Sequence, residues 1–123
     1  MPSKRATLSM LALHFYALKA YRRTEELANK RIATKISYGP FWDYYDRAMA
    51  KLVLGPKDEA LDDYRLAAKL TFNPENFKSV LDGFSFLKGV EDKYPIVGLN
   101  DAITIVEAGK AQAESNIAKQ TNS

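Results

Sequence analysis

LSMLALHFYALKAYRRTEELANKRIATKI, residues 8–36, decides the fold, because this stretch contains neither Gly nor Pro and repeats apolar side chains at helical spacing. At the rise of an α-helix it would be about 40 Å long, the full width of a domain of this size. Within residues 8–18, only Ser9 and His14 interrupt the apolar side chains. A helix that is apolar on nearly all sides needs cover from several directions. The sequence therefore predicts a long first helix around which other helices pack.

Gly and Pro residues divide the rest of the chain into shorter helices. In the pairs Gly39-Pro40 and Gly55-Pro56, the Gly is expected to end one helix and the Pro to begin the next. Asn73-Pro74 is a further signal for the start of a helix. Gly89 is expected to end the helix that begins there. The expected helices are 41–54, 57–71, 74–88 and a last one that is capped at Asn100-Asp101 and reaches at least residue 113. We therefore predict an all-α fold of four to five helices packed around the first, as an antiparallel bundle or as stacked helical hairpins.

Length and composition predict one folded domain. The chain has 123 residues, of which 46% are hydrophobic and 27% charged, which is ordinary for a globular protein. We expect residues 1–123 to form a single helical domain, with a basic arm at 1–6 and a polar tail at 119–123. The chain contains no Cys, which excludes disulfides, thiol nucleophiles, iron–sulfur clusters and cysteine zinc sites.

Charge is distributed unevenly along the chain. Residues 1–56 hold ten Lys and Arg against four Asp and Glu, whereas residues 57–123 hold eight against eleven. Basic and acidic halves of this kind attract each other between copies, and the basic half alone suits a polyanion; the alternative is that both are solvated faces. The i,i+4 pairs Arg22–Glu26 and Glu26–Lys30 are expected to neutralise part of the positive charge within the first helix.

The basic start of the chain imitates a secretory signal, because Lys4 and Arg5 precede the apolar run. Three further basic residues follow the run directly, and no small-residue cleavage site is apparent. We therefore expect no secretion through a signal peptide, and a cytoplasmic or undetermined compartment. No run reaches the roughly 18 apolar residues of a membrane-spanning helix, so no membrane span is predicted.

Residues that carry chemistry are sparse. His14 is the single histidine and has no carboxylate three or four residues away, so we expect a hydrogen-bonded, partly buried histidine with a structural role. The carboxylates cluster at Asp43/Asp46, at 58–63 and at Glu91/Asp92, where solvated faces and helix-start charges explain them. Acid–base chemistry by two carboxylates stays formally open. We predict no catalytic residue, no metal site and no cofactor, and hence a protein that is not an enzyme.

The aromatic run from Tyr38 to Tyr45 is too dense for all of its rings to enter one core. Its rings suit a plain core, a protein interface or stacking on nucleic-acid bases. With the apolar first helix, the run predicts a structural or interaction protein that associates with copies of itself or with a partner, such as a small coat or scaffold subunit. The expected interface residues are Leu8, Leu11, Phe15, Leu18, Tyr38, Phe41, Trp42 and Tyr45.

The basic front half supports an alternative hypothesis, a protein that associates with DNA or RNA. The sequence contains no phosphate-binding loop, dinucleotide fingerprint, zinc pattern or helix-turn-helix spacing, and the absence of these motifs argues against the common enzyme classes. The residues expected to contact nucleic acid are Lys4, Arg5, Lys19, Arg22, Arg23, Lys30, Arg31 and Lys35.

The region of the second and third helices repeats mostly aromatic and small residues at a regular helical spacing, namely Tyr44, Ala48, Gly55, Glu59, Ala60, Tyr64 and Ala67. With these residues the region resembles one helix pair of the tetratricopeptide family. The resemblance covers about a quarter of the chain, and no second copy follows, whereas stable arrays need about three repeats. We interpret the match as a packed antiparallel helix pair, which leaves a helical-hairpin adaptor as a further hypothesis.

Overall fold

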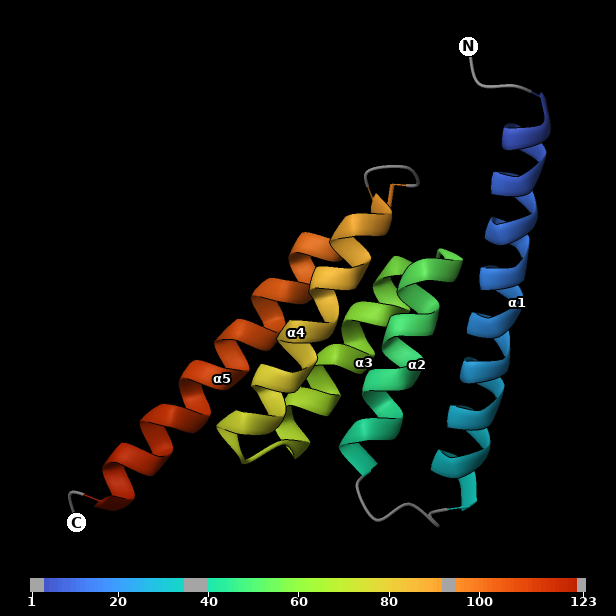
Figure 1. Ribbon diagram of the computed structural model, residues 1–123. Helices are drawn as coiled ribbons and strands as arrows, with labels where there is room; N and C mark the ends of the chain where they lie inside the picture. Colours follow the sequence, from blue (N-terminus) through green and yellow to red (C-terminus); the bar gives the residue numbers. More distant parts are fainter. Residues whose placement is uncertain (1–3, 35–39, 92–94, 122–123) are drawn as a thin grey trace.

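The computed structural model of the protein describes residues 4–34, 40–91 and 95–121, with the side chains of the first helix described from Leu18 onward (Figure 1). All five elements in these ranges are α-helices, so the predicted all-α class is confirmed. They are α1 (Lys4–Thr34), α2 (Pro40–Leu54), α3 (Lys57–Leu70), α4 (Pro74–Glu91) and α5 (Leu99–Thr121).

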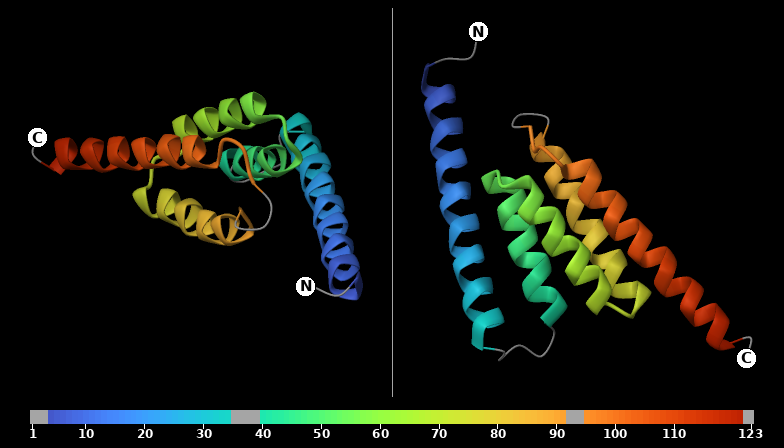
Figure 2. Two further views of the ribbon diagram at one scale, coloured as in Figure 1. Left: turned by 90° about the horizontal axis from the view of Figure 1, so that it is seen from above. Right: turned by 180° about the vertical axis from the view of Figure 1, so that it is seen from behind.

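The helices form a bundle whose centre is made by α2 and α3. These two pack as an antiparallel hairpin, α1 packs on α2, and α5 packs on both α3 and α4. Figures 1 and 2 show α1 at one edge of the bundle in every view. The bundle is therefore assembled beside α1 and not around it, because the chain folds back on itself at α2 and α3 before it places α4 and α5.

The core consists of large side chains from α2 to α5 and of small ones where helices cross. Tyr64, Phe77, Leu87, Leu99 and Val106 are the largest side chains that are fully buried. Full burial of a Phe or Leu side chain contributes about 1.5–3 kcal/mol to folding. Fully buried alanines lie on α2, α3 and α5, where they allow neighbouring helices to approach closely.

Several helix ends differ from the expected ones. Gly55 closes α2 with a φ of +124°, as predicted, but α4 continues past Gly89 to Glu91. A Gly inside a helix costs only about 1 kcal/mol, so a well-packed helix tolerates it. The α5 helix begins at Leu99 and not at the expected Asn100-Asp101 cap, because the carbonyl of Gly98 already accepts a hydrogen bond from the Ala102 N–H.

The expected basic arm and polar tail are partly helical. The α1 helix already includes residues 4–6, and α5 includes residues 119–121. Both segments consist mostly of good helix formers, namely Lys, Arg, Ala and Gln, so nothing in them ends the adjoining helix. Residues 1–3 and 122–123 lie outside the described part of the chain.

Gly109 lies where α5 packs closely against α3 and α4. A Cβ atom on this residue would lie 2.6 Å from Cε1 of Phe77 and 3.2 Å from Cβ of Ala68. The Phe77 ring is only 1% exposed, so it has little room to move away. Gly109→Ala is therefore expected to lower the free energy of unfolding by about 1–2 kcal/mol, although Ala is the better helix former.

Gly83→Ala in α4 is the matched control for this prediction. A Cβ atom there meets nothing within 4 Å, so the change is expected to stabilise the protein by about 0.5–1 kcal/mol. Urea denaturation of the two variants and of the unmodified protein measures both effects. A Gly109→Ala variant as stable as Gly83→Ala would contradict the close packing of α5.

Candidate interaction surface

The C-terminal half of α1 is attached to α2 through one face. Ala28 is buried on this face, and Tyr21, Thr24 and Ile32 are half-buried beside it. These residues recur every three or four positions, which places them along one side of the helix. The part of α1 that faces α2 is therefore the segment from Tyr21 to Ile32.

The opposite side of the same segment carries exposed basic side chains. Lys19, Arg22, Arg23 and Lys30 are all exposed, and by helical spacing they lie on the side away from α2. The expected ion pairs of Glu26 are absent: among the described residues it lies within 4.0 Å of no basic group. Solvent screens such pairs, and each is worth less than about 0.5 kcal/mol. No close ion pair with Glu26 therefore holds these basic side chains.

The N-terminal half of α1 extends beyond the helix on which α1 packs. The α1 helix has 31 residues and α2 has 15, so α1 is about 46 Å long against about 22 Å for α2. Figure 1 shows the N-terminal turns of α1 reaching past the end of α2. By sequence, these turns contain the apolar residues 8–18.

Several predicted site residues have side chains outside the described part of the structure. Leu18, by contrast, is half-buried, and Arg31 is 51% exposed. Lys35 and Tyr38 lie between α1 and α2, in a segment that is not described. The predicted residues without a described side chain are Lys4, Arg5, Leu8, Leu11, Phe15, Lys35 and Tyr38.

The aromatic run does not form one exposed surface. Tyr45 is only 4% exposed, and its hydroxyl forms a 3.2 Å hydrogen bond with Oγ1 of Thr71. Its assignment to an interface is therefore corrected: Tyr45 belongs to the core, where its ring packs 6.2 Å from that of Tyr64. Phe41 is half-buried against the core, and Trp42 is 38% exposed. Of the described aromatic residues in this run, Trp42 offers the most surface to a partner.

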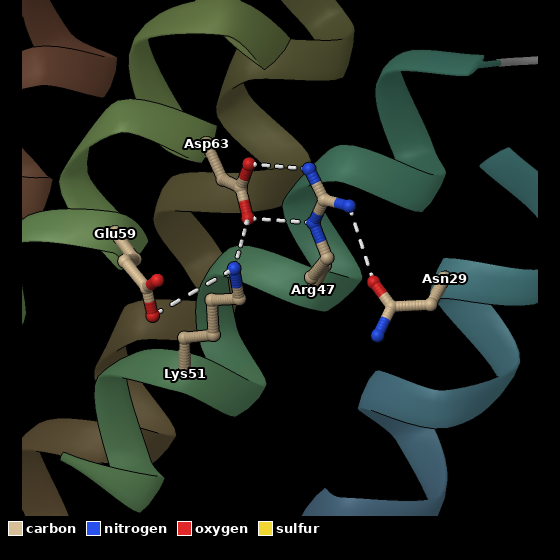
Figure 3. A network of polar contacts seen from close by, with 5 residues as sticks. All are labelled: Asn29, Arg47, Lys51, Glu59 and Asp63. Atoms are coloured by element: carbon tan, nitrogen blue, oxygen red, sulfur yellow. Dashed lines mark hydrogen bonds and ion pairs between the residues drawn. The ribbon is translucent and has the colours of Figure 1, made fainter. Parts of the chain in front are cut away.

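Arg47 of α2 connects three helices through direct hydrogen bonds to α1 and α3 (Figure 3). Its Nε and Nη2 atoms donate to the two carboxylate oxygens of Asp63 on α3, both at 2.8 Å. Its Nη1 atom donates to Oδ1 of Asn29 on α1 at 3.1 Å. Lys51 Nζ lies 3.8 Å from the Asp63 carboxylate and 4.0 Å from that of Glu59. The hydrogen bonds to the Asp63 carboxylate raise the pKa of Arg47, so the guanidinium of Arg47 stays charged.

Two of the acids in the predicted clusters are buried. Asp63 is 6% exposed because it lies between Ala60 and Ala67, on the side of α3 that faces α2. Asp43 is 3% exposed, and Nη1 of Arg31 on α1 lies 3.9 Å from its Oδ1. Its Oδ2 atom has no hydrogen-bond partner among the described residues. The solvated-face interpretation is therefore wrong for Asp63. Asp43 is not solvated either, but it lies in the first turn of α2, as the helix-start interpretation predicts. The exposure of acidic residues 58, 59 and 62 agrees with solvated faces.

Asp46 lies one turn from Asp43 and is half-buried. Burial raises the pKa of Asp46, the charge of Asp43 raises it further, and Arg31 partly lowers it. Because the folded-state pKa lies above the unfolded one, ionised Asp46 destabilises the fold. This cost is absent below the unfolded pKa and appears as the pH rises through the raised folded-state pKa.

Asp46→Asn is therefore expected to be more stable than the unmodified protein at neutral pH. The gain should disappear as the pH falls below the unfolded pKa of about 4, where both side chains are neutral. Urea denaturation at a series of pH values measures the difference. Asp82→Asn, at an exposed site on α4, is the control and should show no such pH-dependent gain. A gain that grows with acidity would contradict this assignment.

An open groove of about 600 Å³ lies between α3 and α5, and sequence reasoning missed it. The small residues Ala68, Gly109 and Ala113 of its lining are buried or half-buried, and we call them its floor. Phe72, which is 82% exposed, and Ile117, which is 46% exposed, also line it. Phe72 falls between two expected helices and on neither apolar stripe, which is the one signal in the sequence that this ring is exposed.

The described residues contain no group of three or more His, Asp or Glu side chains that could hold a metal ion. None of the described helices has the length and apolar character needed to cross a membrane. Comparison with protein-family models, curated proteins and solved structures finds no match for this chain.

Proposed function

We propose that the protein is a non-enzymatic interaction protein that associates with a second copy of itself through the N-terminal half of α1. The observation that carries this proposal is the length of α1, which is about twice that of α2, on which it packs. The turns that extend past α2 contain the most apolar segment of the sequence, residues 8–18. An apolar helix of this kind needs cover on several sides, and the same segment of a second copy supplies it.

Contact between the same segments of two copies gives a closed dimer with twofold symmetry. The Arg47–Asp63 network supports this role for α1, because it fixes the base of the helix through Asn29. A helix that is held at one end presents its other end in a defined direction. Rigid presentation lowers the entropy cost of association.

Binding to nucleic acid is a second candidate, favoured by the exposed basic side of α1. Lys19, Arg22, Arg23 and Lys30 are exposed on that side, and no ion pair with a described acid holds any of them. A row of free cations on a helix at the edge of the molecule suits a phosphate backbone.

Sedimentation equilibrium over a range of protein concentrations tests the proposal. The mass is expected to rise from the 13.8 kDa of one chain to at least twice that value as the concentration increases. A mass of one chain at every concentration would refute self-association. The same experiment with a short single-stranded oligonucleotide tests the second candidate, which requires a complex at low salt that dissociates as salt is added.

A further inference from the structure

The groove between α3 and α5 has a one-sided charge. The charged side chains that line it are Arg65 and Lys69, both cationic and one turn apart on α3. Arg65 is paired with the exposed Asp62, whereas Lys69 is exposed and forms no ion pair with a described residue. Uncharged amides line the opposite wall, on α5. An apolar floor with a cationic edge favours an apolar side chain that is accompanied by a carboxylate.

The outer face of α4 carries that combination. Phe86 is 69% exposed, although it lies in a helix whose other large apolar side chains, where described, are buried or half-buried. Asp82 lies one turn before it and Glu75 two turns before Asp82, so all three share one side of the helix. Neither acid forms an ion pair with a described residue. An unpaired acid and an exposed ring therefore occur together on this face.

We propose that the groove between α3 and α5 of one copy binds the outer face of α4 of a second copy. Phe86 enters the groove over its floor of small residues, beside Phe72. Asp82 then lies next to Lys69 at the cationic edge. The floor of Ala and Gly provides the space for the ring, and aromatic pairs of this kind favour tilted or edge-to-face contacts.

This contact differs in symmetry from the proposed α1 dimer, and the inference rests on self-association as the function. The groove and the α4 face share no residue, so the contact joins two different surfaces. When two copies associate in this way, one copy still has an unoccupied groove and the other still has an unoccupied α4 face. Such a heterologous contact continues from copy to copy until a ring closes or a filament grows. Assemblies larger than a dimer therefore report on this contact, because the α1 contact by itself stops at two chains.

Charge reversal at two exposed positions tests the contact. Lys69→Glu faces Asp82 with a like charge, and Asp82→Lys faces Lys69 with a like charge, so each variant alone is expected to lose assemblies larger than a dimer. The association constant of this step should fall about tenfold in each. In an equimolar mixture, the groove of the first variant can bind the α4 face of the second. The negative charge introduced at position 69 then lies next to the positive charge introduced at position 82, and the two attract each other. The reverse contact between the two variants is the native pair of Lys69 with Asp82, so the mixture is expected to recover the larger assemblies.

Sedimentation velocity measures the size distribution of each variant and of the mixture. Lys88→Glu is the control, because it changes the net charge by the same amount as Lys69→Glu but lies at an exposed site on α4. Larger assemblies in Lys88→Glu and in the mixture, but in neither single variant, would establish the contact. Unmodified protein that stops at a dimer, or single variants that assemble as it does, would overturn this inference and leave the α1 dimer standing. Protein that is monomeric throughout would overturn both.

Discussion

Replacement of Asp63 by Asn is expected to lower the free energy of unfolding by about 3 kcal/mol, the largest effect of any single substitution considered for this protein. The side chain of Asp63 is 8% exposed, and that of Arg47 is 21% exposed. The carboxylate of Asp63 accepts two 2.8 Å hydrogen bonds from Arg47. Without this negative charge, Arg47 stays partly buried and loses the acid that binds it, and Lys51 keeps only the exposed Glu59 at 4.0 Å. Breaking one partner of such a pair is costly because the other charge stays in the interior.

Asp62→Asn on the same helix is the control for this prediction. Asp62 also pairs with an arginine, Arg65 at 2.9 Å, but its side chain is 76% exposed. Loss of an exposed pair is expected to cost less than about 1 kcal/mol. Guanidinium denaturation of both variants measures the difference. Equal stability of Asp63→Asn and Asp62→Asn would show that the network in Figure 3 does not hold α2 to α3.

Phe15→Glu is expected to abolish the α1 dimer. A charged side chain in the centre of an apolar helix contact must be desolvated when two copies meet, and removal of a central aromatic residue commonly costs about 2 kcal/mol or more in binding. A loss of this size weakens the dimer by more than about tenfold. The effect is isolated in a Lys69→Glu background, where assembly through the α3–α5 groove is suppressed and association is expected to stop at the dimer.

Leu27→Glu is the matched control, because Leu27 is an apolar residue of the same helix that is 48% exposed in the half of α1 that packs on α2. This variant is expected to retain the dimer. Circular dichroism checks that both variants remain helical, and sedimentation equilibrium compares their masses. A Phe15→Glu variant that dimerises as tightly as Leu27→Glu would contradict the assignment of the contact to the N-terminal half of α1.

The fold class and most helix boundaries follow from local signals in the sequence. Gly55-Pro56 and Asn73-Pro74 act on the backbone of their own residues, so the breaks between α2, α3 and α4 are visible without any tertiary information. The continuation of α4 past Gly89 cannot be predicted from the sequence, because packing along the whole helix outweighs the small cost of one glycine. The place of α1 at the edge of the bundle was also unpredictable, since apolar residues on all sides do not specify which neighbour covers them.

The candidate sites were predictable to a smaller extent. The basic side of α1 follows from helical spacing alone, and the structure exposes its described members. The burial of Asp63 and Tyr45 depends on how α2 lies against α3, which no local pattern specifies. The groove is likewise a property of two helices, α3 and α5, that are separated by the whole of α4. The exposure of Phe72 has one signal in the sequence, its place between two expected helices, but the groove beside it has none.

Amide hydrogen exchange in residues 8–18, measured as a function of protein concentration, tests the central claim most directly. If a second copy covers the N-terminal half of α1, these amides should exchange more slowly as the concentration rises, because association suppresses local opening of the helix. The amides in the core of α3 should be unaffected over the same range and serve as the internal reference. Exchange in residues 8–18 that is the same at every concentration would contradict the account.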